Sequence, residues 1–326
     1  MAEMTMIQAL NAVLHSEMER ESTMLVLGED VGQTGGVFRV TKGLKKAFGP
    51  ERVLDTPLAE SAIVGTAIGM AVNGCRPVCE MQFSGFSYFA MHQIENHAAR
   101  MRWRSRGRFT VPMVIRMPYG AGVKALEHHS ESKEVFYAHI PGLKMVIPSG
   151  PRAAQGLLLA ALRDPDPVIF FEPKAAYRAF KEDVPDEPEE IPLGRSRVVR
   201  EGGDITLITY GAMLRRTLKA AEQLSEDGIE AEVIDLLTLS PLDDSTFTAS
   251  VRKTGRVVVV HEAHRSFGPA GEIAFRILER SFWWLEAPIR RVTGYDVPVP
   301  YFAREQAYLP DVRRIVEAAH AALDED

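Results

Sequence analysis

The chain has 326 residues, of which 46% are hydrophobic and 25% are charged, and this length favours two globular domains of about 150 residues each. Its net charge of −6 gives no electrostatic support for nucleic-acid binding. The longest uncharged run, 61–75, falls short of the roughly 20 residues that a membrane span needs. Only two cysteines occur, Cys75 and Cys79, without redox or metal spacing, so we expect free thiols and a cytoplasmic protein.

The N-terminal half is predicted to alternate strands and helices. Thr5 and Gln8 have the spacing of a capping box, which opens a helix with one apolar face. Short continuous apolar runs come after it, and such runs are typical of parallel strands buried on both faces. They are 24–27, 77–81, 111–117, 143–148 and 168–172. We therefore predict a doubly wound α/β domain over residues 1–184.

The composition changes after this domain. Prolines alternate with acidic residues in 181–193, which predicts a linker over 185–204. A second set of apolar runs then begins, with helical stretches between them and an amphipathic helix over 311–323. The runs are 205–210, 231–236, 257–261 and 289–292. We predict a second doubly wound α/β domain over 205–326, in which Trp283 and Trp284 fit either the core or an assembly surface.

A carboxylate stands at one strand-to-helix junction, in the segment 55–61. Glu60 directly precedes an uncharged helix whose alanines and glycines predict close packing against its neighbours. Acidic residues are favoured at helix N-termini in any case, so Glu60 fits a helix-start charge as well as a group held for chemistry.

Polar and aromatic side chains come directly after several predicted strands. Parallel sheets bind ligands at the carboxyl ends of their strands, and this edge would gather Glu29, Glu60, Gln82, Phe86 and His129. Each has an ordinary alternative, since a loop histidine is often solvated and a phenylalanine is often core. Two acids, an amide, an aromatic ring and an imidazole together suit a polar heteroaromatic ligand and proton transfer.

Several phosphate-binding signatures are missing from the sequence. It contains no P-loop and no dinucleotide-type glycine fingerprint at a strand–helix turn. It also contains no Gly-Asp-Gly with an Asn some 25–30 residues later, the magnesium-diphosphate signature of thiamine enzymes.

Many segments, in the same order, resemble the β subunit of the first, decarboxylating component of 2-oxo acid dehydrogenase complexes. They are 27–31, 35–38, 55–60, 80–83, 129–132, 141–144, 163–167, 170–174, 253–256 and 308–310. The resemblance implies a thiamine-diphosphate-binding, pyrimidine-type domain and, after it, a transketolase C-terminal-like domain. It also implies an α2β2 heterotetramer whose α subunit holds magnesium, and a lipoyl acyltransferase component that receives the acyl group.

The resemblance carries roles onto particular residues. Glu60 matches the glutamate that hydrogen-bonds the ring nitrogen of the cofactor's aminopyrimidine, and Phe86 matches the aromatic residue against that ring. His129 matches the histidine associated with acyl transfer to the lipoyl group, and His128 adds a second imidazole beside it. Further cofactor contacts are implied for Glu29, Leu58, Ala59 and Gln82, and a structural potassium ion for the oxygens of Met113, Ala161, Leu162, Asp164 and Asp166.

The resemblance also bears on which 2-oxo acid is the substrate. The segments 171–178 and 294–296 resemble those of enzymes that act on branched-chain 2-oxo acids, whereas Phe86 also fits enzymes that act on pyruvate. One alternative is therefore a pyruvate dehydrogenase β subunit. A second is an α/β binding subunit that keeps the fold but is not catalytic. A self-contained transketolase-like homodimer is disfavoured, because the chain lacks its own diphosphate signature.

Overall fold

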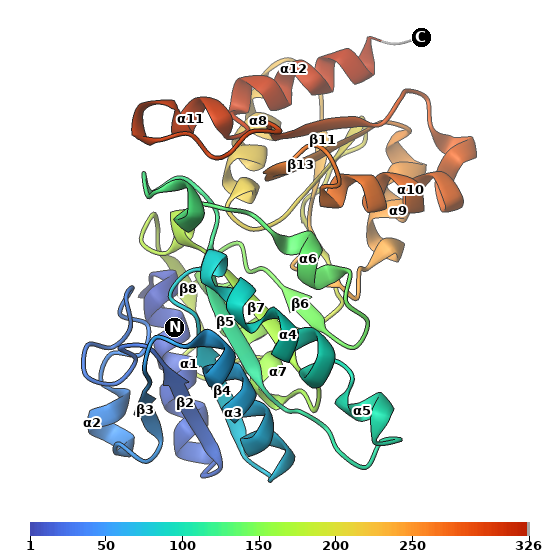
Figure 1. Cartoon of the computed structure of the whole chain (residues 1–326). Coiled ribbons are helices and arrows are strands. Elements are labelled where there is room, and N and C mark those ends of the chain that lie inside the picture. Colours follow the sequence, from blue (N-terminus) through green and yellow to red (C-terminus); the bar gives the residue numbers. More distant parts are fainter. Residues whose placement is uncertain (325–326) are drawn as a thin grey trace. The chain divides into compact units, whose positions relative to one another are not determined.

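A computed structural model describes residues 1–324, which divide into two compact units (Figure 1). The first consists of Met1–Tyr119 and Phe136–Leu193, and the second consists of Gly120–Val135 and the chain from Gly194 onward. The division differs from the predicted boundary at residue 184, and it assigns Gly120–Val135 to the second unit. The reason is that main-chain groups of this segment bond to Glu262 and Glu305.

The first unit is built on a parallel sheet. Within this unit its strands run in the order β6-β7-β5-β4-β2-β3, and every neighbouring pair is parallel. This confirms the strands predicted from the apolar runs. The strands are β2 (Met24–Gly28), β3 (Val53–Asp55), β4 (Arg76–Glu80), β5 (Val114–Tyr119), β6 (Lys144–Val146) and β7 (Val168–Pro173), with β1 (Ala2–Met4) and β8 (Glu182–Val184) forming a small antiparallel pair.

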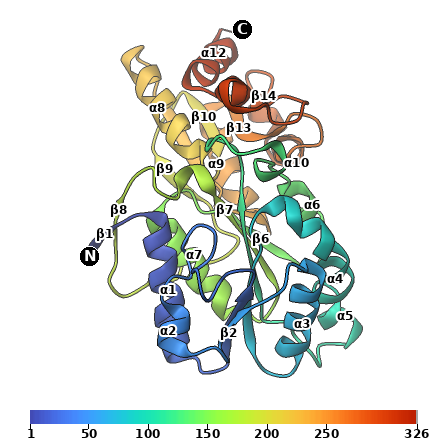
Figure 2. The ribbon, with the colours of Figure 1, turned by 60° about the vertical axis from the view of Figure 1, so that its left-hand side comes forward.

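Helices cover both faces of this sheet. The capping box at Thr5 and Gln8 is present, so the predicted first helix is confirmed. Figure 2 shows α1 and α7 on one side of the sheet and α3 and α4 on the other, which is the doubly wound arrangement. The helices are α1 (Met6–Arg20), α2 (Leu44–Phe48), α3 (Glu60–Val72), α4 (Met91–Gln93), α5 (Met101–Arg104) and α7 (Pro151–Arg163), and α6 (Glu134–Ala138) begins in the second unit.

The small residues of α3 do not all serve close packing. A Cβ built at Gly65 would meet Gln93 at an ordinary 3.6 Å, and one built at Gly69 would meet nothing within 4 Å. Ala62, Thr66 and Gly69 are exposed. The prediction of close packing along the whole helix is therefore wrong at Gly69.

The second unit is built on a five-stranded sheet in the order β14-β13-β10-β11-β9, with only β9 antiparallel. The strands are β9 (Arg197–Arg200), β10 (Ile205–Thr209), β11 (Ala231–Asp235), β13 (Val257–His264) and β14 (Arg290–Gly294), and β12 (Thr238–Ser240) comes after β11 in the chain. The helices are α8 (Met213–Glu226), α9 (Asp244–Thr254), α10 (Pro269–Ser281), α11 (Glu305–Tyr308) and α12 (Val312–Leu323). The predicted last helix is confirmed, with Asp311 capping it.

The segment predicted as a linker contains a strand. Arg197 and Arg200 of β9 form ion pairs with Asp235 and Glu230, which lie on or beside β11. The linker prediction missed β9 because its pairing partner lies more than 30 residues away in the sequence, where no local pattern reports it.

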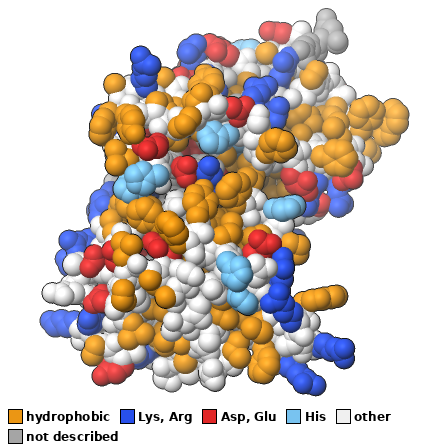
Figure 3. Space-filling model, in the orientation of Figure 1, with side chains coloured by type: hydrophobic (Ala, Val, Ile, Leu, Met, Phe, Trp, Pro, Cys, Tyr) orange, Lys and Arg blue, Asp and Glu red, His pale blue; other side chains and the backbone are white. Residues whose placement is uncertain are grey.

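One apolar patch lies on the surface of the second unit. Figure 3 shows hydrophobic side chains gathered over the part of the molecule formed by α10 and the turn after it. Phe275, Phe282 and Trp283 are exposed there, and Trp283 is 87% exposed. Trp283 is therefore not a core residue. None of the helices in the described part of the chain has the length and hydrophobicity to cross a bilayer.

Candidate functional site

The ends of three neighbouring strands bring the predicted site residues of the first unit together. Glu29 comes directly after β2, Glu60 opens α3 shortly after β3, and Gln82 lies just beyond β4. These strands are adjacent in the order β4-β2-β3 and parallel, so the three side chains start from the same edge of the sheet.

The electrostatics of Glu29 show how closely these groups lie. Burial raises the pKa of the Glu29 carboxyl above its ordinary value, and the charges of Asp30 and Glu60 raise it further. A hydrogen bond with the Gln82 side chain acts in the opposite direction. Glu60 is 8% exposed, whereas Glu29 and Gln82 are half-buried. Glu29 is therefore hydrogen-bonded to the Gln82 amide and lies near enough to Glu60 to sense its charge.

An aromatic group borders these polar side chains. The Phe83 ring lies edge-on to Phe86 at a centroid distance of 5.9 Å and edge-on to Phe38 at 5.6 Å. The Lys174 ammonium lies 5.8 Å from the centre of the Phe83 ring. Phe86 is predicted from the sequence, whereas Phe38 and Phe83 are not. The only feature of the sequence that could have indicated these two residues is their position in loops after strands.

The loop after β2 fixes the entry to α3. The main-chain N–H groups of Gly32 and Gln33 and the ammonium of Lys45 all bond to the Asp55 carboxylate, with Lys45 at 2.7 Å. Burial opposes ionisation of this carboxyl, but these bonds prevail and lower its pKa. Downstream, the Leu58 side chain is 68% exposed and Ala59 is half-buried, and their main-chain contacts to a cofactor stay a prediction.

A buried ion-pair network lies directly behind the site. Arg116 of β5 donates to Glu80 of β4 at 2.6 Å and to both carboxylate oxygens of Glu172 of β7, at 2.7 and 3.0 Å. The Tyr177 hydroxyl also donates to Glu172. Burial raises the pKa of Glu80, and Arg116 opposes this shift. The network joins the strands β4, β5 and β7, and its member Glu80 lies two residues before Gln82 in the chain. In the sequence, its only signal is the presence of charged residues within otherwise apolar runs.

A glycine lets the next loop approach this network. Gly36 has a φ of +79°, and a Cβ there would lie 2.4 Å from a carboxylate oxygen of Glu80. The loop that carries Phe38 therefore packs directly on the ion pair that holds β4 and β5 together.

His129 belongs to the second unit. It ends a short 3-10 turn, Glu127–His129, and its ring centroid lies 4.1 Å from that of His128. His129 is half-buried and His128 is exposed. The structure thus brings Glu29, Glu60, Gln82 and Phe86 together within one unit, while the convergence of His129 with them stays a prediction.

The same segment of the second unit ends at a buried acid. Glu134 is fully buried, and one of its carboxyl oxygens accepts a hydrogen bond from the Tyr210 hydroxyl at 3.0 Å. Its other oxygen has no hydrogen-bond partner among the described residues. Burial, with a smaller contribution from the charge of Glu262, raises the pKa of Glu134 to about 7.

Replacing Glu134 by Gln is expected to remove a pH dependence of stability. In the wild type the unfolded carboxyl loses its proton near its ordinary pKa of 4.5, whereas the folded carboxyl keeps it to about 7. The free energy of unfolding therefore falls as the pH rises between these values, by up to about 3 kcal/mol, and stays reduced above them. Urea unfolding at pH 5.5 and pH 8 measures this difference, with exposed Glu222→Gln as the control. An unchanged difference in Glu134→Gln would contradict the assignment.

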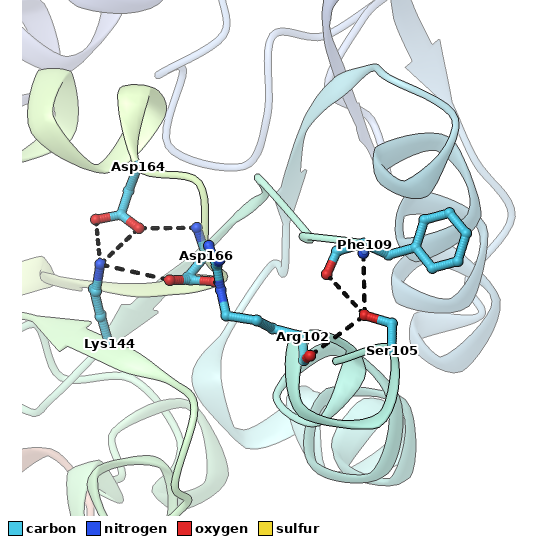
Figure 4. Close-up of polar contacts among 6 residues, drawn as sticks. All are labelled: Arg102, Ser105, Phe109, Lys144, Asp164 and Asp166. Atoms are coloured by element: carbon cyan, nitrogen blue, oxygen red, sulfur yellow. Dashed lines mark hydrogen bonds and ion pairs between the residues drawn. The ribbon is translucent and has the colours of Figure 1, made fainter. Parts of the chain in front are cut away.

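Three of the five predicted potassium ligands bond to cationic side chains of the chain itself, and Figure 4 shows two of them, Asp164 and Asp166. The Lys144 ammonium lies 2.7 and 2.6 Å from the two carboxylate oxygens of Asp164 and 4.0 Å from Asp166, whose other oxygen bonds to Arg102 at 2.6 Å. The main-chain oxygen of Leu162 accepts from Arg76. Because these oxygens already have positively charged partners, the potassium prediction gains no support from this arrangement.

Comparisons with known proteins extend over nearly the whole chain. Residues 2–179 match the family model "Transketolase, pyrimidine binding domain", and residues 194–315 match "Transketolase, C-terminal domain". The pyruvate dehydrogenase E1 component subunit beta of Acholeplasma laidlawii is 51% identical over 315 residues, which cover 97% of this chain and 96% of that protein. Its counterpart from Bacillus subtilis (strain 168) is 50% identical over 324 residues, covering 99% and 100%.

A solved structure supports the fold. A split-gene transketolase, described as an inactive beta4 tetramer, superposes with a TM-score of 0.81 at 22% identity and covers 99% of both chains. At this identity the likeness concerns the fold alone. The two domain models and the relatives, which match over nearly the whole chain, show that the chain belongs to the family of transketolase-like β subunits of the first component of 2-oxo acid dehydrogenase complexes.

Proposed function

We propose that this chain is the β subunit of a pyruvate dehydrogenase, which decarboxylates pyruvate and transfers the acetyl group to the lipoyl group of an acyltransferase component in the cytoplasm. The observation that carries the proposal is the cluster of Glu29, Glu60 and Gln82 at one sheet edge, in a chain about half identical to pyruvate dehydrogenase β subunits over its length. These relatives favour the pyruvate alternative over the branched-chain substrate expected from the segments 171–178 and 294–296.

The cluster fits the pyrimidine half of thiamine diphosphate. An aminopyrimidine offers ring nitrogens, an exocyclic amine and a flat apolar face, which match carboxyl groups, an amide and an aromatic ring. Phe86 and Phe83 supply the ring contacts, and Glu29, Glu60 and Gln82 supply the polar groups. When bound, thiamine diphosphate supplies the nucleophilic carbon and the electron sink for decarboxylation.

Glu60 is the residue that we assign to proton transfer. Its carboxyl would hydrogen-bond the pyrimidine ring nitrogen and hold or release a proton at that atom. Its burial at the start of α3 excludes water from this contact. Glu29 and Gln82, which are hydrogen-bonded to one another, would orient the ring.

His129 is assigned to the second half-reaction. An imidazole titrates near neutral pH, so it can donate a proton while the acetyl group passes to the lipoyl sulfur. Its half-buried position at the end of a short turn leaves the ring accessible to such a group.

An α subunit completes the site in this proposal. The sequence lacks the Gly-Asp-Gly…Asn signature that binds magnesium and diphosphate in thiamine enzymes. An α subunit of the same complex would supply it, together with the magnesium ion, in an α2β2 heterotetramer.

The isolated chain is expected to show no pyruvate turnover with thiamine diphosphate and magnesium, and turnover is expected to appear when the α subunit is added. Half of the cofactor site is missing in the isolated chain, so the cofactor cannot be held there in a reactive geometry. An artificial electron acceptor measures decarboxylation directly, with the α subunit alone as the control. Turnover by the isolated chain would favour the self-contained homodimer instead.

A further inference from the structure

Buried acidic side chains hold the segment that carries His129. This segment, Gly120–Val135, ends with the first two residues of α6 and is packed as part of the second unit. Its own main chain closes a loop, because the N–H of Gly120 donates to the carbonyl of Glu131 at 3.1 Å. Within the loop the N–H of His129 and the hydroxyl of Ser130 both donate to the carbonyl of Leu126, each at 3.0 Å. The position of the whole loop therefore decides the position of His129.

Glu262 of β13 anchors the start of this loop. It is 2% exposed, and its carboxylate accepts a hydrogen bond from the N–H of Ala121 at 2.8 Å. Gly120 has a φ of +83°, and a Cβ there would lie 2.8 and 2.9 Å from the two carboxylate oxygens. The loop's main chain thus rests directly on the carboxylate, at a place where only glycine fits.

Glu305 of α11 anchors the next turn of the loop. It is 1% exposed, and both of its carboxylate oxygens lie 3.1 Å from the N–H of Lys124. At the far end Glu134 accepts the hydrogen bond from Tyr210. Both ends of the loop are therefore fixed to the core of one unit by buried carboxyl groups.

Holding the loop with buried carboxylates costs free energy, which suggests that the position of the loop matters for function. Burying a carboxylate is unfavourable, and a hydrophobic residue of similar size often serves stability as well. A charge-assisted hydrogen bond to a main-chain N–H is short and directional, so it fixes a backbone position better than apolar packing does. Such fixing increases reaction rates where a catalytic group must stay within about 0.5 Å of its productive position.

We infer that Glu262 is a positioning residue for His129, with Glu305 as the second anchor, so that both act on acyl transfer to the lipoyl group rather than on decarboxylation. The inference rests on the proposed function, in which His129 serves the acyl-transfer half-reaction. Neither glutamate needs to touch the substrate or the cofactor, because each acts through the main chain of the loop.

Two rates measured on the complete α/β complex test this inference. Decarboxylation of pyruvate is monitored with an artificial electron acceptor, which bypasses the lipoyl group, and acetylation is monitored on an isolated lipoyl domain. Glu262→Ala is expected to lower lipoyl acetylation by about 10- to 100-fold while decarboxylation stays within about twofold. Glu262→Gln keeps an acceptor for Ala121 and is expected to recover most of the loss. If Glu262→Ala fails to assemble, Glu305→Ala provides the same comparison.

The matched control is Glu232→Ala. Glu232 is also buried in the sheet of the second unit, but it pairs with Lys253 instead of the loop. The inference would be wrong if Glu262→Ala lowered both rates equally, or if it lowered acetylation no more than Glu232→Ala does. Either result would leave the proposed function unaffected. His129→Ala with unchanged acetylation would refute the role of His129, and a wild-type complex inactive on pyruvate would refute the proposed function.

Discussion

Replacing Glu60 by Gln is expected to reduce decarboxylation by the α/β complex by about 100- to 10,000-fold, the usual contribution of a general acid–base group. Glutamine has the shape of glutamate, so the start of α3 and the assembly should persist. It cannot exchange a proton with the pyrimidine ring, so the loss should appear in kcat rather than in assembly or in the affinity for pyruvate. Because Glu60 is only 8% exposed, bulk water has little access to take over this proton exchange.

The control for this variant is Glu19→Gln, at an exposed position on α1 of the same unit. Size-exclusion chromatography checks that both variants assemble, and the artificial electron acceptor gives the rate. Activity of Glu60→Gln close to that of the control would show that Glu60 is only a helix-start charge, which is the simpler of the two interpretations left open by the sequence.

Replacing Arg116 by Met is expected to destabilise the chain by about 3–5 kcal/mol, because it leaves buried charge without a partner. Glu80 and Glu172 are 5% and 0% exposed, and Arg116 is the cation that bonds to both. Urea unfolding measures the change as a lower midpoint. The exposed pair Arg313–Glu317 provides the comparison, since Arg313→Met should change stability by less than about 1 kcal/mol.

A triple variant separates charge from packing at the same place. Replacing Arg116 by Met and both Glu80 and Glu172 by Leu removes all three charges together, and such replacements are often neutral for stability. The triple variant should therefore be more stable than Arg116→Met alone. If it is equally unstable, the loss comes from packing and not from unpaired charge in the ion-pair network.

Local patterns were sufficient to predict most of the sheet. The apolar runs 24–27, 77–81 and 168–172 correspond to β2, β4 and β7, and Glu29, Glu60 and Gln82 were predicted from their positions just beyond strand ends. Such positions can be predicted because a parallel sheet places the carboxyl ends of all its strands on one edge.

Long-range pairing was not accessible in the same way. β9 depends on β11, and the assignment of Gly120–Val135 to the second unit depends on Glu262 and Glu305, which lie far away in the chain. The Arg116 network likewise needs three strands to be side by side before its charges meet.

The structure also explains why the expected branched-chain substrate had little support. The expectation relied partly on Phe171, Glu172 and Tyr177, whose side chains are all buried, at 0–2% exposure. Glu172 and Tyr177 belong to the Arg116 network, and Phe171 packs against Tyr119 and Tyr137. In this chain these residues support the core of the first unit, so their identity reports on packing rather than on the acyl group that is bound.

The most direct measurement is decarboxylation by this chain co-expressed with its α subunit, with thiamine diphosphate and magnesium, comparing pyruvate with 3-methyl-2-oxobutanoate. The kcat/KM is expected to be higher for pyruvate than for 3-methyl-2-oxobutanoate. A preference for the branched acid would keep the site and overturn the proposed substrate. Activity on neither acid, from a complex that assembles, would contradict the assignment of this chain to decarboxylation.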